Sequence, residues 1–248
     1  MNELKVLHMY PDILDLYGDS GNIEILKYHC KNNQIQLLWD RYGIGDSDVD
    51  FSAYDIIFMG GGADFEQSVI SDDLMKRKEQ IVKAYESGVY FFAICGGYQL
   101  LGKYYIDANG NKIDGLGLFE YYTQASKKKN TRCIGNIVVQ TVIDGEEYMV
   151  IGYENHGGQT MNVKQPLGTV LLGEGNCFGG GIEGYVEENV LASYLHGPFL
   201  SKNPKLAYRM INYAMTRKLG KEFHIEMPED SLVDDCRKHL LERFLEKS

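Results

Sequence analysis

The chain has 248 residues, of which 44% are hydrophobic and 24% charged, a composition typical of a globular protein that buries one large core. Its net charge of −10 argues against nucleic acid or an anionic membrane surface as the main partner. The five cysteines are far apart and form no C-x-x-C pair, which favours a reducing compartment and argues against a disulfide framework or a zinc site.

The chain start carries no long apolar region of the kind a signal peptide needs, and no apolar run approaches the roughly 20 residues that span a bilayer. We therefore expect a cytoplasmic protein. No repeat, low-complexity tract or clear linker divides the chain, so we expect one domain over residues 1–248, with its core over about 4–214.

The first half of the chain alternates short apolar runs with segments of helical character. This order, β-α-β-β-α-β-α, predicts an α/β fold: a mostly parallel sheet flanked by helices on both faces. The predicted strands are 4–10, 35–39, 55–59 and 89–94, and the predicted helices are about 20–31, 66–87 and 98–103.

The most informative stretch of the sequence is the apolar run Val89–Ile94 followed by Cys95, Gly96 and Gly97. An uninterrupted apolar run is typical of a strand buried on both faces. The small residues around the cysteine allow a sharp strand-to-helix turn, as in the G-x-S-x-G elbow of hydrolases. Cys95 is therefore a candidate nucleophile, and the alternative is a buried structural cysteine beside a glycine turn.

Gly60-Gly61-Gly62 follows the preceding predicted strand, so it should lie at the same edge of the sheet as Cys95. Glycines there let backbone N–H groups approach a ligand closely. The pattern has neither the spacing of a dinucleotide site nor a Walker lysine. An oxyanion donor opposite Cys95 suits it better than a nucleotide site, although a triple glycine alone is often only a tight turn.

The second half predicts further strands, a glycine-dense hairpin or loop over 173–184, and two helices near the end of the chain. A basic segment over 127–132 is by default a solvated loop, but an arginine there could bind a carboxylate through two hydrogen bonds. The last predicted helix, 231–247, is amphipathic, and its apolar side could pack on the body or on a partner. The predicted strands are 115–118, 134–142, 148–153 and 190–195, and the other helix is 204–219.

A nucleophilic cysteine needs a base within hydrogen-bond distance. Of the six histidines, only His156 and His196 directly follow predicted strands and precede glycines, where α/β active sites gather. Composition and spacing do not separate these two residues.

Three motifs together resemble the class I glutamine amidotransferases, in the branch found in cobyric acid synthases. They are Ala93–Gln99, with sequence AICGGYQ, the earlier Gly60-Gly61-Gly62, and Tyr194–Pro198, with sequence YLHGP. Within that branch, three further motifs resemble the glutaminase subunits of lipid II isoglutaminyl synthases; they are 18–23 (GDSGNI), 131–132 (TR) and 152–158 (GYENHGG). The resemblance covers the chain from about residue 4 to 214.

The resemblance implies roles for residues of several of these motifs. Cys95 would be the nucleophile and His196 its base, a Cys–His dyad. Arg132 would hold the substrate glutamine at its α-carboxylate, and Gln99 is a further candidate substrate contact. Many members of the class carry a glutamate two residues after the histidine to orient the imidazole, but this chain has Pro198 there.

The resemblance also leaves parts of the site open. Gly61 or Gly62, together with Gly96, would supply the oxyanion N–H groups. For the residue that orients the imidazole of His196, Glu154 is a candidate on charge alone, and no role is assigned to Asn155 or His156.

The resemblance further implies hydrolysis of L-glutamine to glutamate and ammonia, with no metal or cofactor in this chain. The ammonia would pass to a MurT-like Mur ligase subunit that holds ATP and Mg²⁺ and amidates the D-glutamate α-carboxyl of lipid II. The chain itself would need neither a nucleic acid partner nor a membrane span.

Three alternatives stay open at this point. The chain could be a glutaminase subunit that serves another acceptor, as in cobyric acid synthases. It could be a cysteine peptidase or stress protein built on a similar elbow. It could also be a non-catalytic scaffold subunit with a vestigial elbow.

Overall fold

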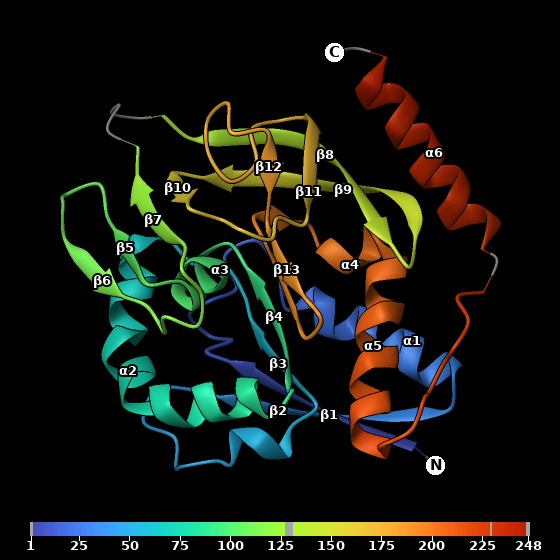
Figure 1. Ribbon diagram of the computed structural model, residues 1–248, viewed down its shortest axis with the longest axis horizontal. Helices are drawn as coiled ribbons and strands as arrows, with labels where there is room; N and C mark the ends of the chain where they lie inside the picture. Colours follow the sequence, from blue (N-terminus) through green and yellow to red (C-terminus); the bar gives the residue numbers. More distant parts are fainter. Residues whose placement is uncertain (1, 127–130, 229, 247–248) are drawn as a thin grey trace.

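A six-stranded sheet forms the centre of the computed structural model, which describes residues 2–126, 131–228 and 230–246 (Figure 1). Its strand order is β13-β14-β4-β3-β1-β2, and every neighbouring pair is parallel except β13 with β14. The mostly parallel sheet predicted from the sequence is thus confirmed. Its strands are β1 (Asn2–Met9), β2 (Ile35–Tyr42), β3 (Ile56–Met59), β4 (Tyr90–Ile94), β13 (Tyr185–Glu187) and β14 (Val190–Ser193).

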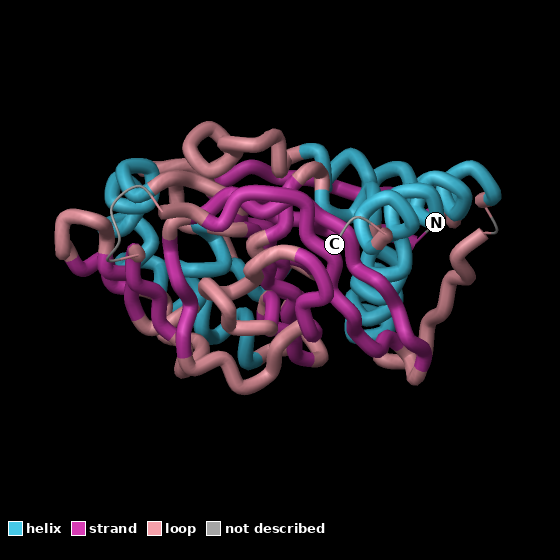
Figure 2. The backbone as a smooth tube through the Cα atoms, turned by 90° about the horizontal axis from the view of Figure 1, so that it is seen from above, coloured by secondary structure: helices cyan, strands magenta, loops and turns pink. Residues whose placement is uncertain are grey.

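Helices cover both faces of this sheet, as the βαβ order requires. α1 packs against α4 and α5 on one face, whereas α2 and α3 lie on the other (Figure 1). Seen from above, strands run through the middle of the molecule with helices on either side (Figure 2). The helices are α1 (Gly21–Asn32), the 3₁₀ turn η1 (Phe51–Ala53), α2 (Asp64–Glu86), α3 (Gly96–Leu101), α4 (Phe199–Lys202), α5 (Pro204–Leu219) and α6 (Ser231–Leu245).

Burial explains why the sequence pattern predicts the central strands correctly. All residues of β3 and β4 are buried, and the rings of Phe58 and Phe92 stack at 5.0 Å between centroids. Phe92 also contacts Phe199 at 6.2 Å, which joins the sheet to α4. Strands covered on both faces carry continuous apolar runs, and this pattern is visible without a structure.

Two smaller sheets pack beside the carboxyl ends of the central strands. One has the order β10-β7-β5-β6 and the other β12-β11-β8-β9-β15. The long β8–β9 hairpin dominates the second sheet and crosses the upper part of the view in Figure 1. The strands are β5 (Tyr104–Ile106), β6 (Lys112–Asp114), β7 (Tyr122–Ala125), β8 (Cys133–Ile143), β9 (Glu146–His156), β10 (Gly158–Met161), β11 (Gly168–Leu172), β12 (Ile182–Glu183) and β15 (Leu195–His196).

The predicted strand at 115–118 is wrong, because this segment has no strand structure. It packs instead against the end of α3, where Leu116 N–H donates to the Leu100 carbonyl at 2.8 Å. Gly115 lies against the residue that follows α3, since a Cβ on Gly115 would be 2.2 Å from the Gly102 carbonyl oxygen. The glycines of this segment serve close packing rather than a strand. Part of the basic segment, residues 127–130, lies outside the described residues.

The last helix, α6, lies beside the hairpin end of the second sheet (Figure 1). Asp230 caps its start by accepting from the Leu232 and Val233 N–H groups. Arg237 anchors the helix, since it donates to the Met149 carbonyl at 2.6 Å and stacks over the Tyr148 ring at 4.4 Å. Leu232 is 72% exposed. The prediction of a helix at this place is confirmed.

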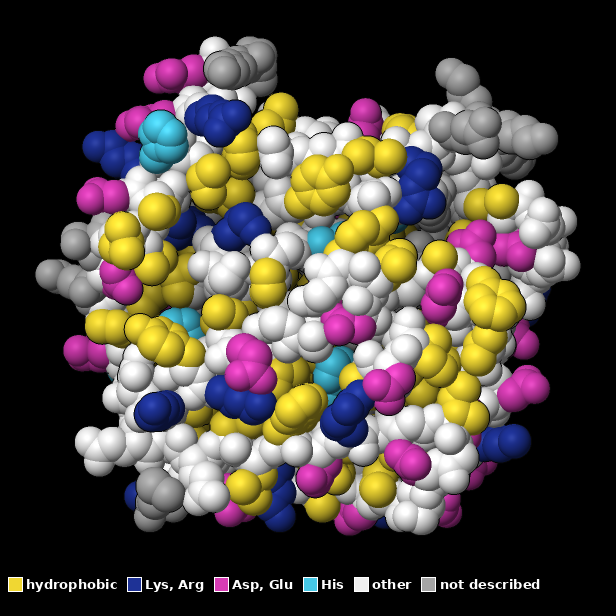
Figure 3. Space-filling view, turned by 180° about the vertical axis from the view of Figure 1, so that it is seen from behind, with side chains coloured by type: hydrophobic (Ala, Val, Ile, Leu, Met, Phe, Trp, Pro, Cys, Tyr) yellow, Lys and Arg dark blue, Asp and Glu magenta, His cyan; other side chains and the backbone are white. Residues whose placement is uncertain are grey.

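Acidic, basic and hydrophobic side chains are interspersed over the face seen from behind (Figure 3). Among the described residues, no helix is both long and apolar enough to cross a membrane.

Candidate active site

Cys95 lies at the junction of β4 and α3 with φ of 50° and ψ of −104°, an unfavourable backbone conformation for a residue with a side chain. Two backbone hydrogen bonds hold this turn. The Cys95 N–H donates to the Ser193 carbonyl at 2.8 Å, and the Gly97 N–H donates to the Gly60 carbonyl at 3.1 Å. The elbow expected from the sequence is therefore present, and the turn lies at the carboxyl end of the central strand β4.

His196 lies at the end of β15, which pairs with β9 through Tyr153. Its Nδ1 is 3.0 Å from Oδ1 and 3.1 Å from Oδ2 of Asp19, and both side chains are fully buried. The Asp19 carboxylate therefore fixes the ring orientation and keeps the Nδ1 proton in place. Nε2 is then the nitrogen that can exchange a proton with the cysteine, and it has no hydrogen-bond partner among the described residues.

Asp19 is the orienting carboxylate that the sequence left open. It comes from the turn between β1 and α1, and its position adds a third member to the predicted Cys–His dyad. Pro198 fills the position where many members of the class have a glutamate, and it packs on α1. A Cβ on Gly21 would lie 2.4 Å from Pro198 Cγ.

The electrostatics of the pair favour a charged imidazole. Burial alone would lower the pKa of His196, but the negative charge of the Cys95 sulfur and the hydrogen bond to Asp19 raise this pKa to about 10. An imidazolium beside a thiolate is the ion pair that activates a nucleophilic cysteine. The ring of Tyr17, 37% exposed, covers the imidazole at 4.5 Å between centroids.

Gly61 lies between the three candidate catalytic residues. A Cβ at this position would lie 2.8 Å from His196 Cε1, 2.9 Å from Asp19 Oδ2 and 3.1 Å from Cys95 Cβ. The Gly61 N–H donates to Asp19 Oδ2 at 2.9 Å, so this N–H holds the carboxylate. Gly62 and Gly96 therefore remain the candidate oxyanion donors, and their backbones are adjacent, since a Cβ on Gly96 would be 2.9 Å from the Gly62 nitrogen.

Gln99 is 3% exposed, and both ends of its side chain are bonded. Its Oε1 accepts from Gln67 at 2.7 Å, and its Nε2 donates to the Tyr194 hydroxyl at 3.0 Å. A direct contact with substrate would require an exchange of one of these partners, and it stays a prediction. The observed role of Gln99 is to join α3, α2 and the strand end that carries His196.

Arg132 lies at a cavity of about 690 Å³ whose wall includes Asp64, Tyr105, Gln124 and Gly157. Its Nε and Nη2 donate to the side chain and carbonyl of Asn155, each at 3.0 Å. These bonds fix the guanidinium at the rim of the cavity. Cys95 is not in the wall of this cavity, so the role of Arg132 in binding glutamine stays a prediction.

Glu154 does not orient His196, which corrects the expectation from charge alone. Its Oε1 accepts from the Glu174 N–H at 2.8 Å and its Oε2 from the Gly175 N–H at 2.9 Å. The histidine nearest to it is His156, with 3.8 Å between Oε2 and Nε2. His156 stacks on Tyr194, 3.6 Å between centroids, and does not contact Asp19 or Cys95 through any hydrogen bond found in the described residues.

Sequence reasoning missed Asp19 as a functional residue. It lies in a turn-rich, polar segment, and it lies 177 residues from the histidine that it serves. Two signals were available: Asp19 is part of the 18–23 motif, and the loop after the first strand of a parallel sheet reaches the same edge as the glycines after the neighbouring strand.

A cysteine at a strand-to-helix elbow, with a buried His–Asp pair beside it on a mostly parallel sheet, is the arrangement expected of an α/β enzyme with a cysteine nucleophile. Comparison with known proteins makes the class specific. Residues 5–204 match the CobB/CobQ-like glutamine amidotransferase domain, and the chain belongs to this family.

Two curated relatives are similar over nearly the whole chain. One is "Lipid II isoglutaminyl synthase (glutamine-hydrolyzing) subunit GatD" of Streptococcus pneumoniae, 41% identical over 94% of this chain and 88% of that protein. The protein of the same name from Staphylococcus aureus is 38% identical over 88% of this chain and 87% of its own length. A "Probable cobyric acid synthase" of Methanococcus maripaludis is 32% identical, but only 32% of that protein is covered.

Among solved structures, PurLQS from Thermotoga maritima matches with a TM-score of 0.56 at 15% identity, over 88% of this chain and all of that chain. The likeness supports the fold alone.

Proposed function

We propose that this chain is the glutamine-hydrolysing subunit of a lipid II isoglutaminyl synthase, and that Cys95, His196 and Asp19 carry out the hydrolysis. The observation that carries this proposal is the buried Asp19–His196 pair beside the strained elbow cysteine. The two relatives named as such subunits support lipid II as the acceptor of the ammonia, because this chain covers more than four fifths of the length of each.

In the proposed reaction, the Cys95 thiolate attacks the side-chain amide carbon of L-glutamine. The N–H groups of Gly62 and Gly96 stabilise the oxyanion, a contribution of roughly 3–4 kcal/mol per donor in well-studied hydrolases. The imidazolium of His196 gives its proton to the leaving nitrogen, and the tetrahedral intermediate loses ammonia to form a γ-glutamyl thioester. Water, deprotonated by His196, then hydrolyses the thioester to glutamate and restores the thiolate.

Asp19 acts through His196 in both halves of the reaction. Its carboxylate stabilises the imidazolium and keeps Nε2 directed toward the sulfur and the leaving group. Arg132 would bind the α-carboxylate of glutamine with the guanidinium N–H groups that Asn155 does not use.

The proposed partner is a MurT-like Mur ligase subunit that binds ATP, Mg²⁺ and lipid II and receives the ammonia in the cytoplasm. The word "subunit" in the names of both relatives supports the existence of a partner. A cobyric acid synthase-like acceptor is less favoured, because those relatives are about three times as long as the segment that this chain matches.

The test is amide transfer in the reconstituted complex with ¹⁵N-amide glutamine, ATP and lipid II. We expect ¹⁵N in the isoglutamine of the product with the wild-type chain. The complex with Cys95→Ala should make no product from glutamine but should amidate lipid II when free ammonia is added. Glutamine-dependent amidation by the Cys95→Ala complex would overturn the proposal and support a scaffold role. Failure of the wild-type complex to amidate lipid II even with ammonia would overturn the proposed acceptor.

A further inference from the structure

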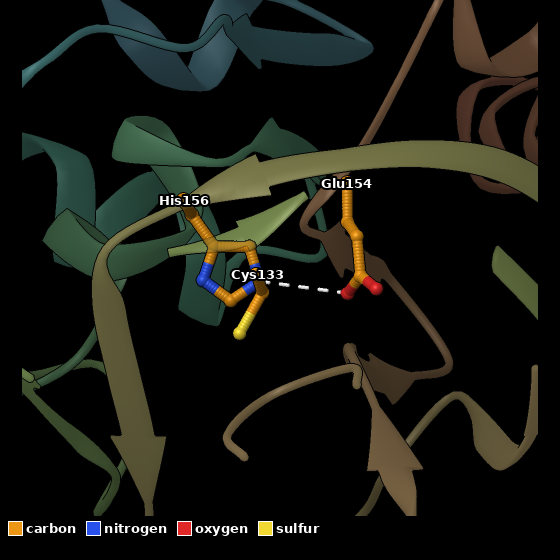
Figure 4. Close-up of side chains that lie close together, drawn as sticks. All are labelled: Cys133, Glu154 and His156. Atoms are coloured by element: carbon orange, nitrogen blue, oxygen red, sulfur yellow. Dashed lines mark ion pairs between the residues drawn. The ribbon is translucent and has the colours of Figure 1, made fainter. Parts of the chain in front are cut away.

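A second group of reactive side chains lies outside the catalytic triad, on the β8–β9 hairpin. The antiparallel register pairs Cys133 directly with His156, and Glu154 lies two residues before His156, on the same face of β9. All three residues are buried. The Sγ of the cysteine, a carboxylate oxygen and a ring nitrogen lie within 4.8 Å of one another, and Figure 4 shows the side chains converging.

The histidine presents an unused lone pair to this group. Nδ1 of His156 lies 2.7 Å from the Gly158 carbonyl oxygen, so Nδ1 carries the proton and donates it. In the neutral ring the lone pair is therefore on Nε2, and this nitrogen has no hydrogen-bond partner in the part of the chain that the structure describes. A ring N–H bonded to a carbonyl is the usual support of a metal-binding histidine, since it fixes both tautomer and ring orientation.

The other two donors are held in a similar way. Two backbone N–H groups, of Glu174 and Gly175, donate to the Glu154 carboxylate and fix its orientation. The amide of Gln159 donates to the Cys133 sulfur at 3.6 Å. Each of the three donors thus has a hydrogen-bond partner outside the group, and each keeps a lone pair with which it could bind a metal.

We propose that Cys133, Glu154 and His156 form a zinc site, with one sulfur, one nitrogen and one oxygen ligand and a fourth position open to water. Zinc accepts this mixed donor set at bond lengths of about 2.0–2.3 Å, which puts neighbouring ligand atoms of a tetrahedral site roughly 3.3–3.7 Å apart. The observed 3.8 Å between Nε2 and Oε2 already approaches that spacing.

The position of the site suggests what the metal does. The His156 ring stacks on Tyr194, whose hydroxyl bonds with Gln99 and Thr160, and Tyr194 lies two residues before His196. Glu154 holds the loop that starts at Gly173. Zinc would therefore connect the β8–β9 hairpin, the loop that starts at Gly173 and the strand end that precedes His196.

The test is metal titration of the full chain after treatment with a chelator, in the Cys95→Ser background so that the catalytic thiol cannot contribute. We expect one equivalent of Zn²⁺ per chain by elemental analysis, and a thermal midpoint that rises with added Zn²⁺. With Co²⁺ as the probe, a sulfur-to-cobalt charge-transfer absorption should appear. Cys133→Ser should remove that absorption, and Glu154→Gln and His156→Gln should each weaken Co²⁺ binding at least tenfold.

The control is Cys236→Ser, which removes an exposed thiol on α6 and should leave the absorption unchanged. The proposal would be overturned if the folded chain bound less than stoichiometric Zn²⁺ and Co²⁺. It would be overturned equally if the charge-transfer absorption survived in Cys133→Ser. Should Cys133→Ser fail to fold, the stoichiometry and the thermal midpoint of the parent chain decide the question.

Discussion

Asp19 and His196 are 177 residues apart in the chain, yet Oδ1 of Asp19 lies 3.0 Å from Nδ1 of His196 in the buried interior. The contact joins the turn after β1, in the central sheet, to β15, which belongs to the sheet that contains the β8–β9 hairpin. It therefore depends on the correct packing of these two sheets. Asp19 supplies the carboxylate that orients the imidazole, a role that Pro198 cannot fill because proline has no carboxylate side chain.

Asp19→Asn should lower kcat about 10²–10⁴-fold, because an amide neither stabilises the imidazolium nor enforces the proton at Nδ1. The same change should lower the pKa of His196 from about 10, since one of the negative charges that raise it is removed. Steady-state glutaminase assays and NMR titration of the imidazole measure these effects. Asp12→Asn, at an exposed carboxylate, is the control and should alter neither quantity. An active Asp19→Asn enzyme would refute the positioning role.

Cys95→Gly should be more stable to urea than Cys95→Ala by about 1 kcal/mol. At φ of 50°, a side chain is strained by about 1–3 kcal/mol, and glycine releases this strain. At an unstrained position the alanine variant should be the more stable of the two, because glycine gains more conformational entropy than alanine on unfolding. The matched control is Cys30, in the regular helix α1, where the glycine variant should be the less stable one. The same order at both positions would mean that the elbow is not strained.

Arg132→Ala should raise KM for glutamine about tenfold or more and change kcat little, because a contact to the α-carboxylate is equal in the ground and transition states. Initial rates over a range of glutamine concentrations separate the two constants. Arg41→Ala, at another exposed arginine, should leave KM unchanged. If Arg132→Ala leaves KM unchanged, the substrate carboxylate binds elsewhere.

Glu183→Gln should flatten the dependence of stability on pH. Burial raises the pKa of Glu183 from 4.5 to about 7, against the opposing hydrogen bonds from the Tyr194 N–H and the Ser193 hydroxyl. The folded state therefore holds a proton that the unfolded state loses above pH 4.5. This contribution to stability is complete below pH 4.5 and is lost as the pH rises through about 7, with a total on the order of 3 kcal/mol.

Urea unfolding at pH 5 and pH 8 measures the effect. The difference in unfolding free energy between the two pH values should be smaller in Glu183→Gln than in the wild type, since glutamine accepts the same two hydrogen bonds without titrating. In Glu188→Gln, at an exposed carboxylate, the difference should stay as in the wild type. An unchanged difference in Glu183→Gln would show that this carboxyl is ionised throughout the range.

Local pattern was enough to predict much of this fold. The continuous apolar run of β4, the glycines after Cys95 and the helix Pro204–Leu219 follow from rules that act within a few residues. The segment 115–118 was misread, because its glycines serve a close contact with α3 that no local rule reveals.

The parts of the site that escaped prediction depend on contacts between distant segments. Asp19 meets His196 only through the packing of two sheets. Cys133 meets His156 only through the register of the β8–β9 hairpin. Neither pair has a spacing along the chain that marks it as a site, and the wide spacing of the cysteines argued against zinc.

The most direct test of the central claim is glutamate and ammonia release from L-glutamine by the purified chain, alone and with its ligase partner. We expect Cys95→Ala and His196→Ala to abolish release in both settings, while the control Cys236→Ser retains the wild-type rate. Continued release of ammonia by Cys95→Ala would contradict the account, because Cys95 is the cysteine that lies beside Gly61 and whose charge acts on His196.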